Sequence, residues 1–551
     1  TNPKEFTTED GSVITLGTGC ATDPYLIYTP GQLDDVRNHL FDLMSLLIPL
    51  MEEYTMEPPP ASAFDPLKNA NQNFSQIRNI DLQNYIQVKY PLEGWHPIGD
   101  NIFNVMEASE MPEHIDLFLG NYNGNNKIID NLLINIDASS AVKSAGLFSG
   151  ICGNLFNMNL RNANVICNSS GNLSDASVLT GLALNINMIL IEMTGSFDFD
   201  LTNTVKVENC NLYNTNLQVN NCPYLNNISL LTPVAYFTDF TDCEINGNVT
   251  VNNSRCQIVS LAIGELGSGS AKRVKANGNI NIEQCELARI SGLVGAWNSL
   301  EFASNDISIE DCVTTGRIEA KDTKYFDSLT GLIGQIPGPT SDMEDFPNMY
   351  VKNCKSSMDL TIDGYNGNGE YGLAAGGIIG NCCITAGEYF DETRIKLSDC
   401  EYSGNITIND MNEYILEIGG LVGTGNLISI DNCEFKGKIN YENSSTFQVS
   451  IGGLVGRLGS YIYDSYTNVR NCSTSAGADI TLTNITEPTD YGDNYELNIG
   501  TLIGINYSDC CRGTDSLTGC SANNELKLIS YDDSPYNHFG GEQGYIYPLD
   551  A

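Results

Sequence analysis

Positive charge is scarce in this chain of 551 residues, where 27 Lys and Arg residues stand against 68 Asp and Glu residues. The formal net charge is therefore -41, which repels phosphate backbones and anionic lipid. This excludes binding of nucleic acid or of a membrane surface through electrostatics. Charged residues make up only 17% of the chain, so uncharged polar residues, chiefly Asn, Ser and Thr, have to provide its solubility. A divalent cation is the natural counter-charge.

Long apolar runs and catalytic motifs are missing as well. The longest apolar stretch, Leu40 to Met51, contains Asp42 and Pro49 and is too short to span a bilayer. No charged start followed by an apolar segment is visible, so we expect the numbering to begin at a mature, cleaved N-terminus. The sequence contains no H-E-x-x-H, no G-x-S-x-G and no P-loop. We interpret the four scattered histidines as surface or packing residues: His39, His96, His114 and His538.

Cysteine, in contrast, is abundant. Eighteen cysteines are many for a reducing cytosol, and no C-x-x-C pair or Cys/His cluster indicates zinc. We therefore expect an extracellular or cell-surface location.

A glycine-bracketed apolar tetrad recurs in the second half of the chain, at intervals of between 33 and 48 residues. Its copies are Gly292-Leu293-Val294-Gly295, Gly331-Leu332-Ile333-Gly334, Gly377-Ile378-Ile379-Gly380, Gly420-Leu421-Val422-Gly423, Gly453-Leu454-Val455-Gly456 and the degenerate Thr501-Leu502-Ile503-Gly504. One supersecondary unit repeated in this way predicts a solenoid, in which each repeat packs on its neighbours.

The rest of the repeat predicts a parallel β-helix. An alternating strand such as 428–430 leads to an acidic or amide residue and a cysteine, for example Asn432-Cys433. Glycine follows four residues later and Ile or Val two residues beyond it, which indicates stacked coils in register. We predict three strands and one coil per repeat, with two coils per repeat as the alternative. At one coil per repeat, successive cysteines come within disulfide distance, but we interpret most of them as buried small residues.

The N-terminal region has a different period. Apolar residues recur at steps of three and four from Pro30 to about Tyr54, which predicts an amphipathic helix that caps the first coil. We accordingly divide the chain into a lead-in and capping helix (1–60), first coils (61–150), main repeats (151–505) and a C-terminal cap or docking tail (506–551). The fold class is all-β, a parallel β-helix with a short N-terminal capping helix.

The sequence resembles that of GLUG-motif proteins from about residue 20 to 505. The tetrads carry this resemblance, together with the segments 23–33, 79–82, 95–99, 120–136 and 145–148. It implies a secreted or surface-attached right-handed β-helix of the kind found in adhesins and envelope proteins of bacteria and archaea, and it implies no catalytic residues. In composition, the chain is also similar to the disulfide-rich sheath or surface-layer proteins of methanogenic archaea.

Few residues are candidates for binding or catalysis. Asp363, Asn366, Asn368 and Glu370 offer oxygen ligands on a glycine-rich loop and form a weak candidate for a Ca²⁺ site, and we expect no other cofactor. Asp198 and Asp200 share one strand face and could form the carboxylate pair of a polysaccharide lyase or hydrolase, although a solvated strand face explains them better. The basic cluster at 272–275 more readily balances local negative charge than binds an anionic sugar.

Some cysteines are candidates for cross-links between chains. Neighbouring residues of a strand point to opposite sides, so one thiol of a vicinal pair is expected to face outward. The candidates are Cys20, Cys382, Cys383, Cys510, Cys511 and Cys520.

Together these features predict an extracellular structural protein without enzyme activity. We expect it to assemble with further copies of itself into a cell-envelope sheath, surface layer or filament, with cell-wall or surface glycans as further partners. The alternative is a cell-surface adhesin or glycan-binding β-helix, and a polysaccharide lyase or hydrolase comes third.

Overall fold

The computed structural model describes most of the chain in two compact units, Thr1–Gly247 (unit 1) and Asn248–Ala551 (unit 2). The described residues are 5–7, 13–15, 17–46, 48, 72–102, 113–169, 171–194, 201–299, 306–325, 327–337, 347–366, 372–383, 393–412, 415–459, 467–485, 496–507, 517–529, 537–539 and 541–546. Among them, no helix is long and apolar enough to cross a membrane.

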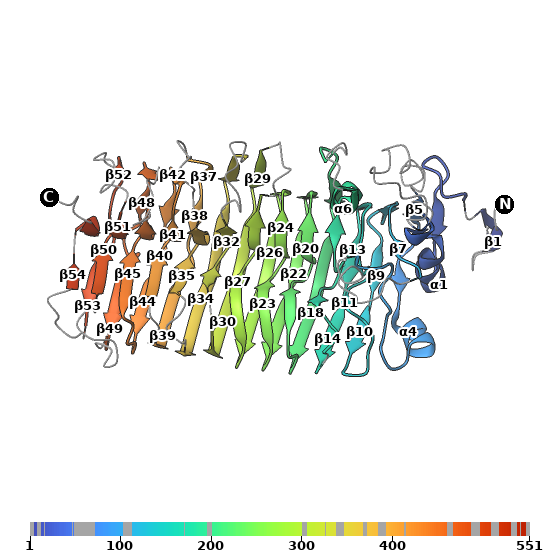
Figure 1. Cartoon of the computed structure of the whole chain (residues 1–551), viewed down its shortest axis with the longest axis horizontal. Helices are drawn as coiled ribbons and strands as arrows, with labels where there is room; N and C mark the ends of the chain where they lie inside the picture. The colour runs from blue at the N-terminus through green and yellow to red at the C-terminus, as the bar shows by residue number, and fades with distance from the viewer. Residues whose placement is uncertain are drawn as a thin grey trace. The chain divides into compact units, whose positions relative to one another are not determined.

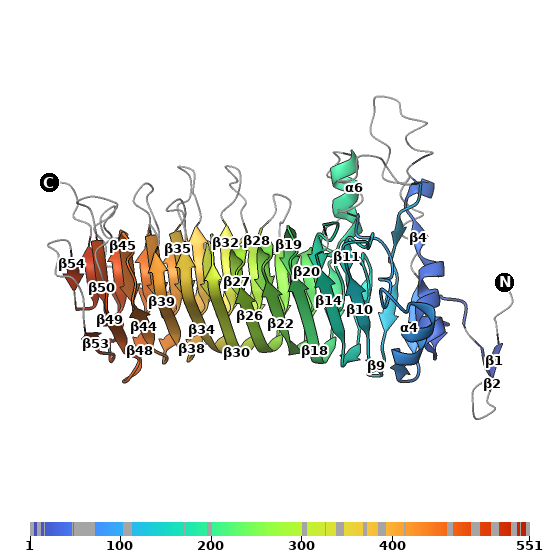
Figure 2. The same ribbon diagram turned by 90° about the horizontal axis from the view of Figure 1, so that it is seen from below.

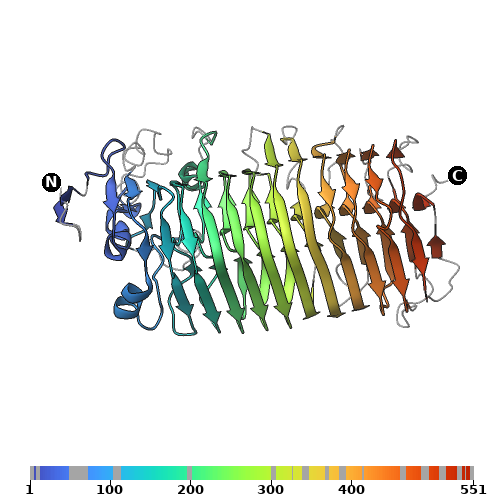
Figure 3. The ribbon, with the colours of Figure 1, turned by 180° about the vertical axis from the view of Figure 1, so that it is seen from behind.

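Unit 2 is a parallel β-helix whose coils contribute strands to four parallel sheets (Figures 1 and 3). Sheet 1 contains β25 (Ser270–Lys272), β29 (Ile307–Glu310), β33 (Met349–Lys352), β37 (Ile395–Ser398), β42 (Ile428–Asp431), β47 (Asn468–Arg470) and β52 (Leu517–Thr518). Sheet 2 contains β26 (Lys275–Glu283), β30 (Val313–Thr323), β34 (Lys355–Asn366), β38 (Glu401–Tyr402), β39 (Ile406–Asn412), β43 (Glu434–Phe435), β44 (Ile439–Glu442), β48 (Ser473–Thr474), β49 (Ile480–Thr483) and β53 (Leu526–Leu528). The predicted all-β, parallel β-helical fold class is confirmed.

Sheets 3 and 4 complete each coil of unit 2. Sheet 3 contains β23 (Arg255–Ser260), β27 (Glu286–Ser291), β31 (Ser328–Thr330), β35 (Gly372–Gly376), β40 (Ile415–Gly419), β45 (Gln448–Gly452), β50 (Glu496–Gly500) and β54 (Asn537–Phe539). Sheet 4 contains β24 (Ile263–Gly267), β28 (Val294–Asn298), β32 (Ile333–Pro337), β36 (Ile379–Cys383), β41 (Val422–Gly425), β46 (Val455–Leu458), β51 (Ile503–Asn506) and β55 (Gln543–Ile546).

One sequence repeat forms one coil, as predicted. The third residues of successive tetrads pair across neighbouring strands, so Val422 lies opposite Val455 and Val455 opposite Ile503. The predicted number of three strands per coil is wrong, because the first two residues of each tetrad form a corner between a strand of sheet 3 and a strand of sheet 4, which begins at the third residue. Each coil therefore has four strand positions.

Two of the four corners keep one length in the coils of unit 2 before the last. Two residues join sheet 1 to sheet 2 there, and two join sheet 3 to sheet 4, as between β40 and β41. The other two corners vary in length from coil to coil, for example between β41 and β42 and between β46 and β47. Most of the variation in repeat length lies at these two corners, and a smaller part lies within sheet 2, where three residues join β43 to β44 and five join β48 to β49.

The tetrad glycines are required because successive coils approach one another closely there. A Cβ atom on Gly420 would lie 2.1 Å from the carbonyl oxygen of Gly453 and 2.4 Å from the Phe435 ring. A Cβ atom on Gly423, at the other end of the tetrad, would lie 2.6 Å from the carbonyl oxygen of Gly380. Each tetrad is therefore packed between the tetrads of the coils before and after it.

The acidic or amide residue before each column cysteine forms the corner between sheets 1 and 2. Asp399, Asn432 and Asn471 have φ values of 54°, 54° and 51°, in the left-handed region that Asp and Asn tolerate better than other side chains. Their side chains also stack, since Asn432 Nδ2 donates to Asp399 Oδ1 at 2.6 Å. Side chains stack in a second ladder at the end of sheet 2, in the series Asp363, Asn409, Asn443 and Asn484.

Unit 1 uses the same arrangement of parallel strands (Figure 2). Its first sheet contains β3 (Tyr25–Ile27), β5 (Asn73–Gln76), β8 (Asn121–Asn123), β12 (Asn154–Phe156), β17 (Val205–Glu208) and β21 (Thr238–Thr241). Its second sheet contains β6 (Ile80–Asp81), β9 (Ile128–Asp130), β10 (Leu133–Ile136), β13 (Asn159–Arg161), β14 (Asn164–Asn168) and β18 (Asn211–Asn220). Its third sheet contains β11 (Ser144–Ala145), β15 (Asp175–Ala176) and β19 (Leu225–Ile228), and its fourth contains β16 (Ala183–Leu184) and β20 (Thr232–Tyr236). The strands β1 (Glu5–Thr7) and β2 (Val13–Thr15) form a separate hairpin, and β22 spans Glu244–Asn252.

The prediction of one amphipathic helix from Pro30 to about Tyr54 is wrong over the described residues. Helix α1 covers only Pro30–Asp34, begins with a capping box between Thr29 and Gln32, and continues as the 3-10 helix η1 (Asp35–His39). Leu40 is extended, because the next residues form β4 (Phe41–Asp42), which pairs antiparallel with β7 (Asp116–Leu117). Two further helices follow, α4 (Gln83–Lys89) and α6 (Ile186–Thr194), the second of which projects from its coil in Figure 2.

The region after residue 505, expected to lose the repeat pattern, contributes one more set of strands. β52, β53, β54 and β55 pair in parallel with β47, β49, β50 and β51. These residues therefore cover the preceding coil as another coil of the same kind.

Candidate binding site at the N-terminal cap

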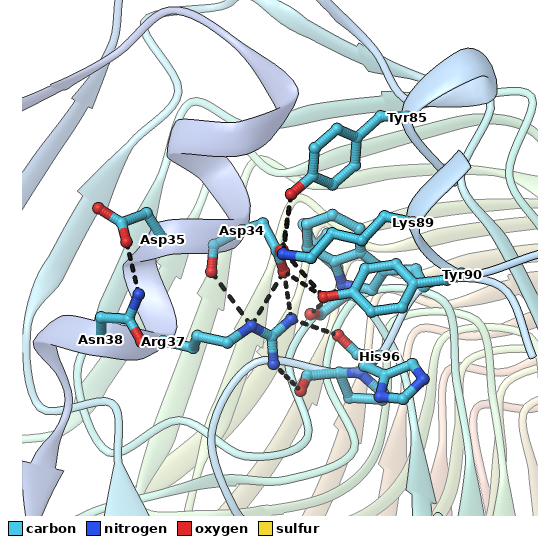
Figure 4. Close-up of polar contacts among 11 residues, drawn as sticks. Asp34, Asp35, Arg37, Asn38, Tyr85, Lys89, Tyr90 and His96 are labelled. Carbon is cyan, nitrogen blue, oxygen red and sulfur yellow. Dashed lines mark hydrogen bonds and ion pairs between the residues drawn. The ribbon is translucent and has the colours of Figure 1, made fainter. Parts of the chain in front are cut away.

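A buried carboxylate links the two short helices of the cap. Asp34, the last residue of α1, is 2% exposed. Its Oδ1 accepts from Arg37 Nε at 2.9 Å, its Oδ2 accepts from the Tyr85 and Tyr90 hydroxyls at 2.8 and 2.9 Å, and Lys89 forms an ion pair with it (Figure 4). One carboxylate therefore has four side-chain partners.

Helical spacing brings these partners together. Asp34 and Arg37 lie three residues apart at the junction of α1 and η1, and Tyr85 and Lys89 lie four apart on α4, so each pair shares one face of its helix. The Arg37 guanidinium also donates to the carbonyl oxygens of His96 and Pro97, at 3.0 and 3.3 Å. The cluster thus joins α1, α4 and the segment that follows Trp95.

The charges of this cluster are mutually stabilised. Burial alone would raise the pKa of Asp34, but hydrogen bonds from Lys89, Tyr85 and Arg37 lower it to about 2. The hydrogen bond to Asp34 in turn raises the pKa of Lys89. Both groups are therefore ionised over the whole physiological pH range.

A cavity of about 290 Å³ adjoins the cluster and shares Arg37 with it. Its polar lining includes Arg37, His96, Asp100, Asn101, Lys143 and Ser149. The volume is close to the lower end of typical ligand sites, about 300 to 1,000 Å³. A small polar ligand is the occupant that this lining and volume fit.

Asp100 provides a carboxyl group in the wall of the cavity. Its Oδ2 accepts from the main-chain N–H of Asp116 at 2.8 Å. Burial, reinforced by the nearby Asp116 carboxylate, raises the pKa of Asp100. Burial and the Asp42 carboxylate raise the pKa of Asp116 in the same way. Burial also acts on Asp42, but its hydrogen bonds with His114 and with the main-chain N–H groups of Ile115 and Met44 together lower its pKa.

The predicted histidine roles agree with the structure where side chains are described. His39 stacks on Tyr25 with ring centroids 4.4 Å apart, and His96 stacks on Tyr90 at 4.5 Å. His114 is exposed and pairs with Asp42, while the His538 side chain lies outside the described residues. His96 has a second role that the sequence did not indicate, because it lines the cavity.

The calcium candidates do not come together within the described residues. Asp363 is exposed and its Oδ1 accepts from Asn409 Nδ2 at 2.6 Å. The side chain of Asn366 and the whole of Asn368 and Glu370 lie outside the described residues, as do Asp198 and Asp200. No group of three or more His, Cys, Asp or Glu side chains in the described part is arranged to hold a metal ion. The Ca²⁺ site stays a prediction.

The cross-linking role predicted for Cys382 is wrong, because its thiol is 0% exposed and donates to the Asn426 carbonyl oxygen at 3.2 Å. Cys20 is exposed and Cys520 is partly exposed, so both remain accessible thiols. The side chain of Cys383 and the residues Cys510 and Cys511 lie outside the described part. Every cysteine whose side chain is described is a free thiol.

The basic cluster at 272–275 balances local negative charge, as the sequence favoured. Lys272 Nζ lies 3.1 Å from Glu310 Oε2 on the neighbouring strand. The functional candidate that sequence reasoning missed is the cavity. Its signal was present in one segment that the GLUG resemblance singled out, 95–99, where His96 and Pro97 line the cavity and their carbonyl oxygens accept from Arg37.

No protein-family model and no curated protein matches this chain. The relation to GLUG-motif proteins and to sheath proteins therefore stays a prediction. Among solved structures, the chain is similar to one described as "a putative immunoglobulin A1 protease from Bacteroides ovatus". The match has a TM-score of 0.35 and 13% identity, and it covers 63% of this chain and 79% of the other.

This match contradicts the prediction that the chain is not an enzyme, which we withdraw. The match assigns no catalytic residue to this chain.

Proposed function

We propose that this chain is an extracellular β-helix protein that binds a glycan through an acidic sugar in the cavity beside Arg37. The observation that carries the proposal is the lining of that cavity, where Arg37, His96 and Lys143 lie around a single carboxyl group, Asp100. Such a concentration of basic side chains is unusual in a chain with a net charge of -41. It fits a ligand that bears a carboxylate.

The remaining lining supports a sugar rather than a simple anion. Asn101 and Ser149 add amide and hydroxyl groups, which pair with sugar hydroxyls that both donate and accept. The Asp100 carboxyl group adds a further acceptor for sugar hydroxyls. Arg37 is held in place by Asp34 and two carbonyl oxygens, so little side-chain entropy is lost when a ligand binds.

Replacing Lys143 by glutamine is expected to weaken binding of uronate oligosaccharides about tenfold, the equivalent of one charge-assisted hydrogen bond. Calorimetric titration of the full chain with oligomers of galacturonate or glucuronate measures this. Lys127→Gln is the matched control, because it removes the same charge from a residue that does not line the cavity. Equal losses of affinity in the two variants, or no binding of the oligosaccharides by the native chain, would contradict the proposal.

Self-association into a sheath, surface layer or filament is the second proposal, and the last coil favours it. Ile529 is 66% exposed, and Leu526 and Leu528 are half-buried, whereas Ile480 and Leu482 one coil earlier are fully buried. Within the described residues, β52 to β55 pair with other strands on one edge only. An apolar, open edge of this kind is a template for a further copy of the chain.

We expect the molar mass from light scattering to rise with protein concentration, and Ile529→Glu to suppress the rise by placing a charge at the contact. Val88→Glu is the control, because Val88 is 84% exposed and lies in unit 1. A native chain that stays monomeric at every concentration would rule out self-association.

A further inference from the structure

A column of cysteine side chains runs through the interior of unit 2. Successive coils place Cys312, Cys354, Cys400, Cys433 and Cys472 at the same corner, each 0 to 2% exposed. Cys520 occupies this position in the last coil, because its neighbours Thr518 and Ser521 pair with Arg470 and Ser473. The column therefore has a buried body and one partly exposed end.

The hydrogen bonds of the column thiols run to the main chain. Each thiol donates to a carbonyl oxygen, as Cys433 Sγ does to that of Asp431 at 3.2 Å. Main-chain N–H groups also point at the sulfurs, since Cys433 N lies 3.3 Å from Cys472 Sγ and Cys400 N lies 3.4 Å from Cys433 Sγ. Amide donors of this kind stabilise sulfur that carries negative charge, as around metal-bound thiolates.

The geometry points to a site for a soft monovalent cation, Cu(I), between Cys472 and Cys520. Neighbouring parallel strands lie about 4.8 Å apart, which sets the separation of their side chains. A metal with two sulfur ligands at about 2.3 Å each spans about 4.6 Å. Thiolate ligands select Cu(I) among the physiological soft cations.

Other metals fit the column less well. Zinc in a structural site takes four ligands in a tetrahedron, and the described residues contain no group of three or more ligating side chains arranged for a metal. A two-coordinate cation requires only two aligned sulfurs. Cys520 is the one thiol of the column that solvent reaches, and Cys472 is the buried thiol next to it, so this pair lies nearest to the solvent.

Binding exchanges protons for metal without any redox step. In the metal-free chain the Cys472 thiol donates to the Arg470 carbonyl oxygen at 3.1 Å, and the Cys520 thiol donates to that of Val469 at 3.4 Å. Cu(I) enters as Cu(I), both thiols release their protons to the buffer, and two sulfur–copper bonds form.

The test is a titration of the reduced full-length chain with Cu(I) under an inert atmosphere, in competition with the chromogenic chelator bicinchoninate. We expect the chain to withdraw copper from the chelator, and Cys520→Ser to lower the affinity by more than about tenfold. Cys472→Ser is expected to do the same, with circular dichroism to confirm that this buried variant is folded. Cys20→Ser, which removes the exposed thiol of unit 1, is expected to change nothing.

Four results would overturn the assignment. The first is a Cys520→Ser variant that binds copper as tightly as the native chain. The second is loss of the tight site in Cys20→Ser. The third is a copper-dependent doubling of molar mass, which would show that the metal joins two chains. Competition by an equal concentration of Zn(II) would likewise contradict a site selective for a soft monovalent cation.

Discussion

Gly420→Ala is expected to lower the free energy of unfolding of unit 2 by about 3 kcal/mol, near the upper end of overpacking effects. The added methyl group would lie 2.1 Å from the Gly453 carbonyl oxygen and 2.4 Å from the Phe435 ring. The first of these contacts is with main chain, so relief requires the stacked coils to separate. Urea denaturation, monitored by circular dichroism, measures the loss of unfolding free energy.

Gly541→Ala is the matched control for this substitution. Nothing lies within 4 Å of a Cβ atom built on Gly541, and the residue is exposed in the same unit. We expect its urea midpoint to stay within error of the native value. If both variants unfold at the native midpoint, the close approach of coils at the tetrad does not contribute to stability.

Asp34→Asn is expected to destabilise unit 1 by about 2 kcal/mol, because it removes the buried carboxylate that pairs with the half-buried Arg37 and the exposed Lys89. The same group makes stability depend on pH. Its pKa is about 2 in the folded chain and 3.8 ordinarily, so the folded state binds its proton less tightly than the unfolded state. The stabilisation is therefore complete above about pH 4 and is lost as the pH falls towards 2, at roughly 2 kcal/mol in all.

The measurement is the urea midpoint of the native chain and of Asp34→Asn between pH 2 and 7. The difference between the two proteins should shrink as the pH falls through the lower end of this range. Asp35→Asn serves as the control, since the Asp35 side chain is 52% exposed and lies next in sequence. A constant difference between native and Asp34→Asn at every pH would show that the Asp34 carboxylate is not the group that titrates.

The repetitive part of the fold was predictable because it rests on local chemistry repeated many times. Asp or Asn before cysteine marks a left-handed corner, and the paired glycines mark a close approach of coils, so both signals survive changes in loop length. The tetrad nevertheless looked like part of a strand along its whole length, because it contains no polar residue that would mark a turn. Only the division into sheets 3 and 4 shows that its first two residues turn the chain.

The candidate site was not predictable in the same way, because it is assembled from residues distant in sequence. Tyr85 and Lys89 follow Asp34 by about fifty residues, and nothing repeated in the sequence relates the two helices. The apolar period after Pro30 predicted one long helix, yet pairing of β4 with β7 and the hydrogen bonds of Asp42 to Met44 and Ile115 end it at Leu40. Tertiary contacts, rather than the apolar period of the local sequence, therefore decide where the helix ends.

An inserted residue has different consequences at the two kinds of corner. In the coils of unit 2 before the last, two residues join sheet 1 to sheet 2 and two join sheet 3 to sheet 4, so an inserted residue there would shift every later strand of the coil out of register. The joins from sheet 2 to sheet 3 and from sheet 4 to sheet 1 already differ from coil to coil. Recognition surfaces built on those two edges can therefore diversify by insertion while the hydrophobic interior keeps its alignment.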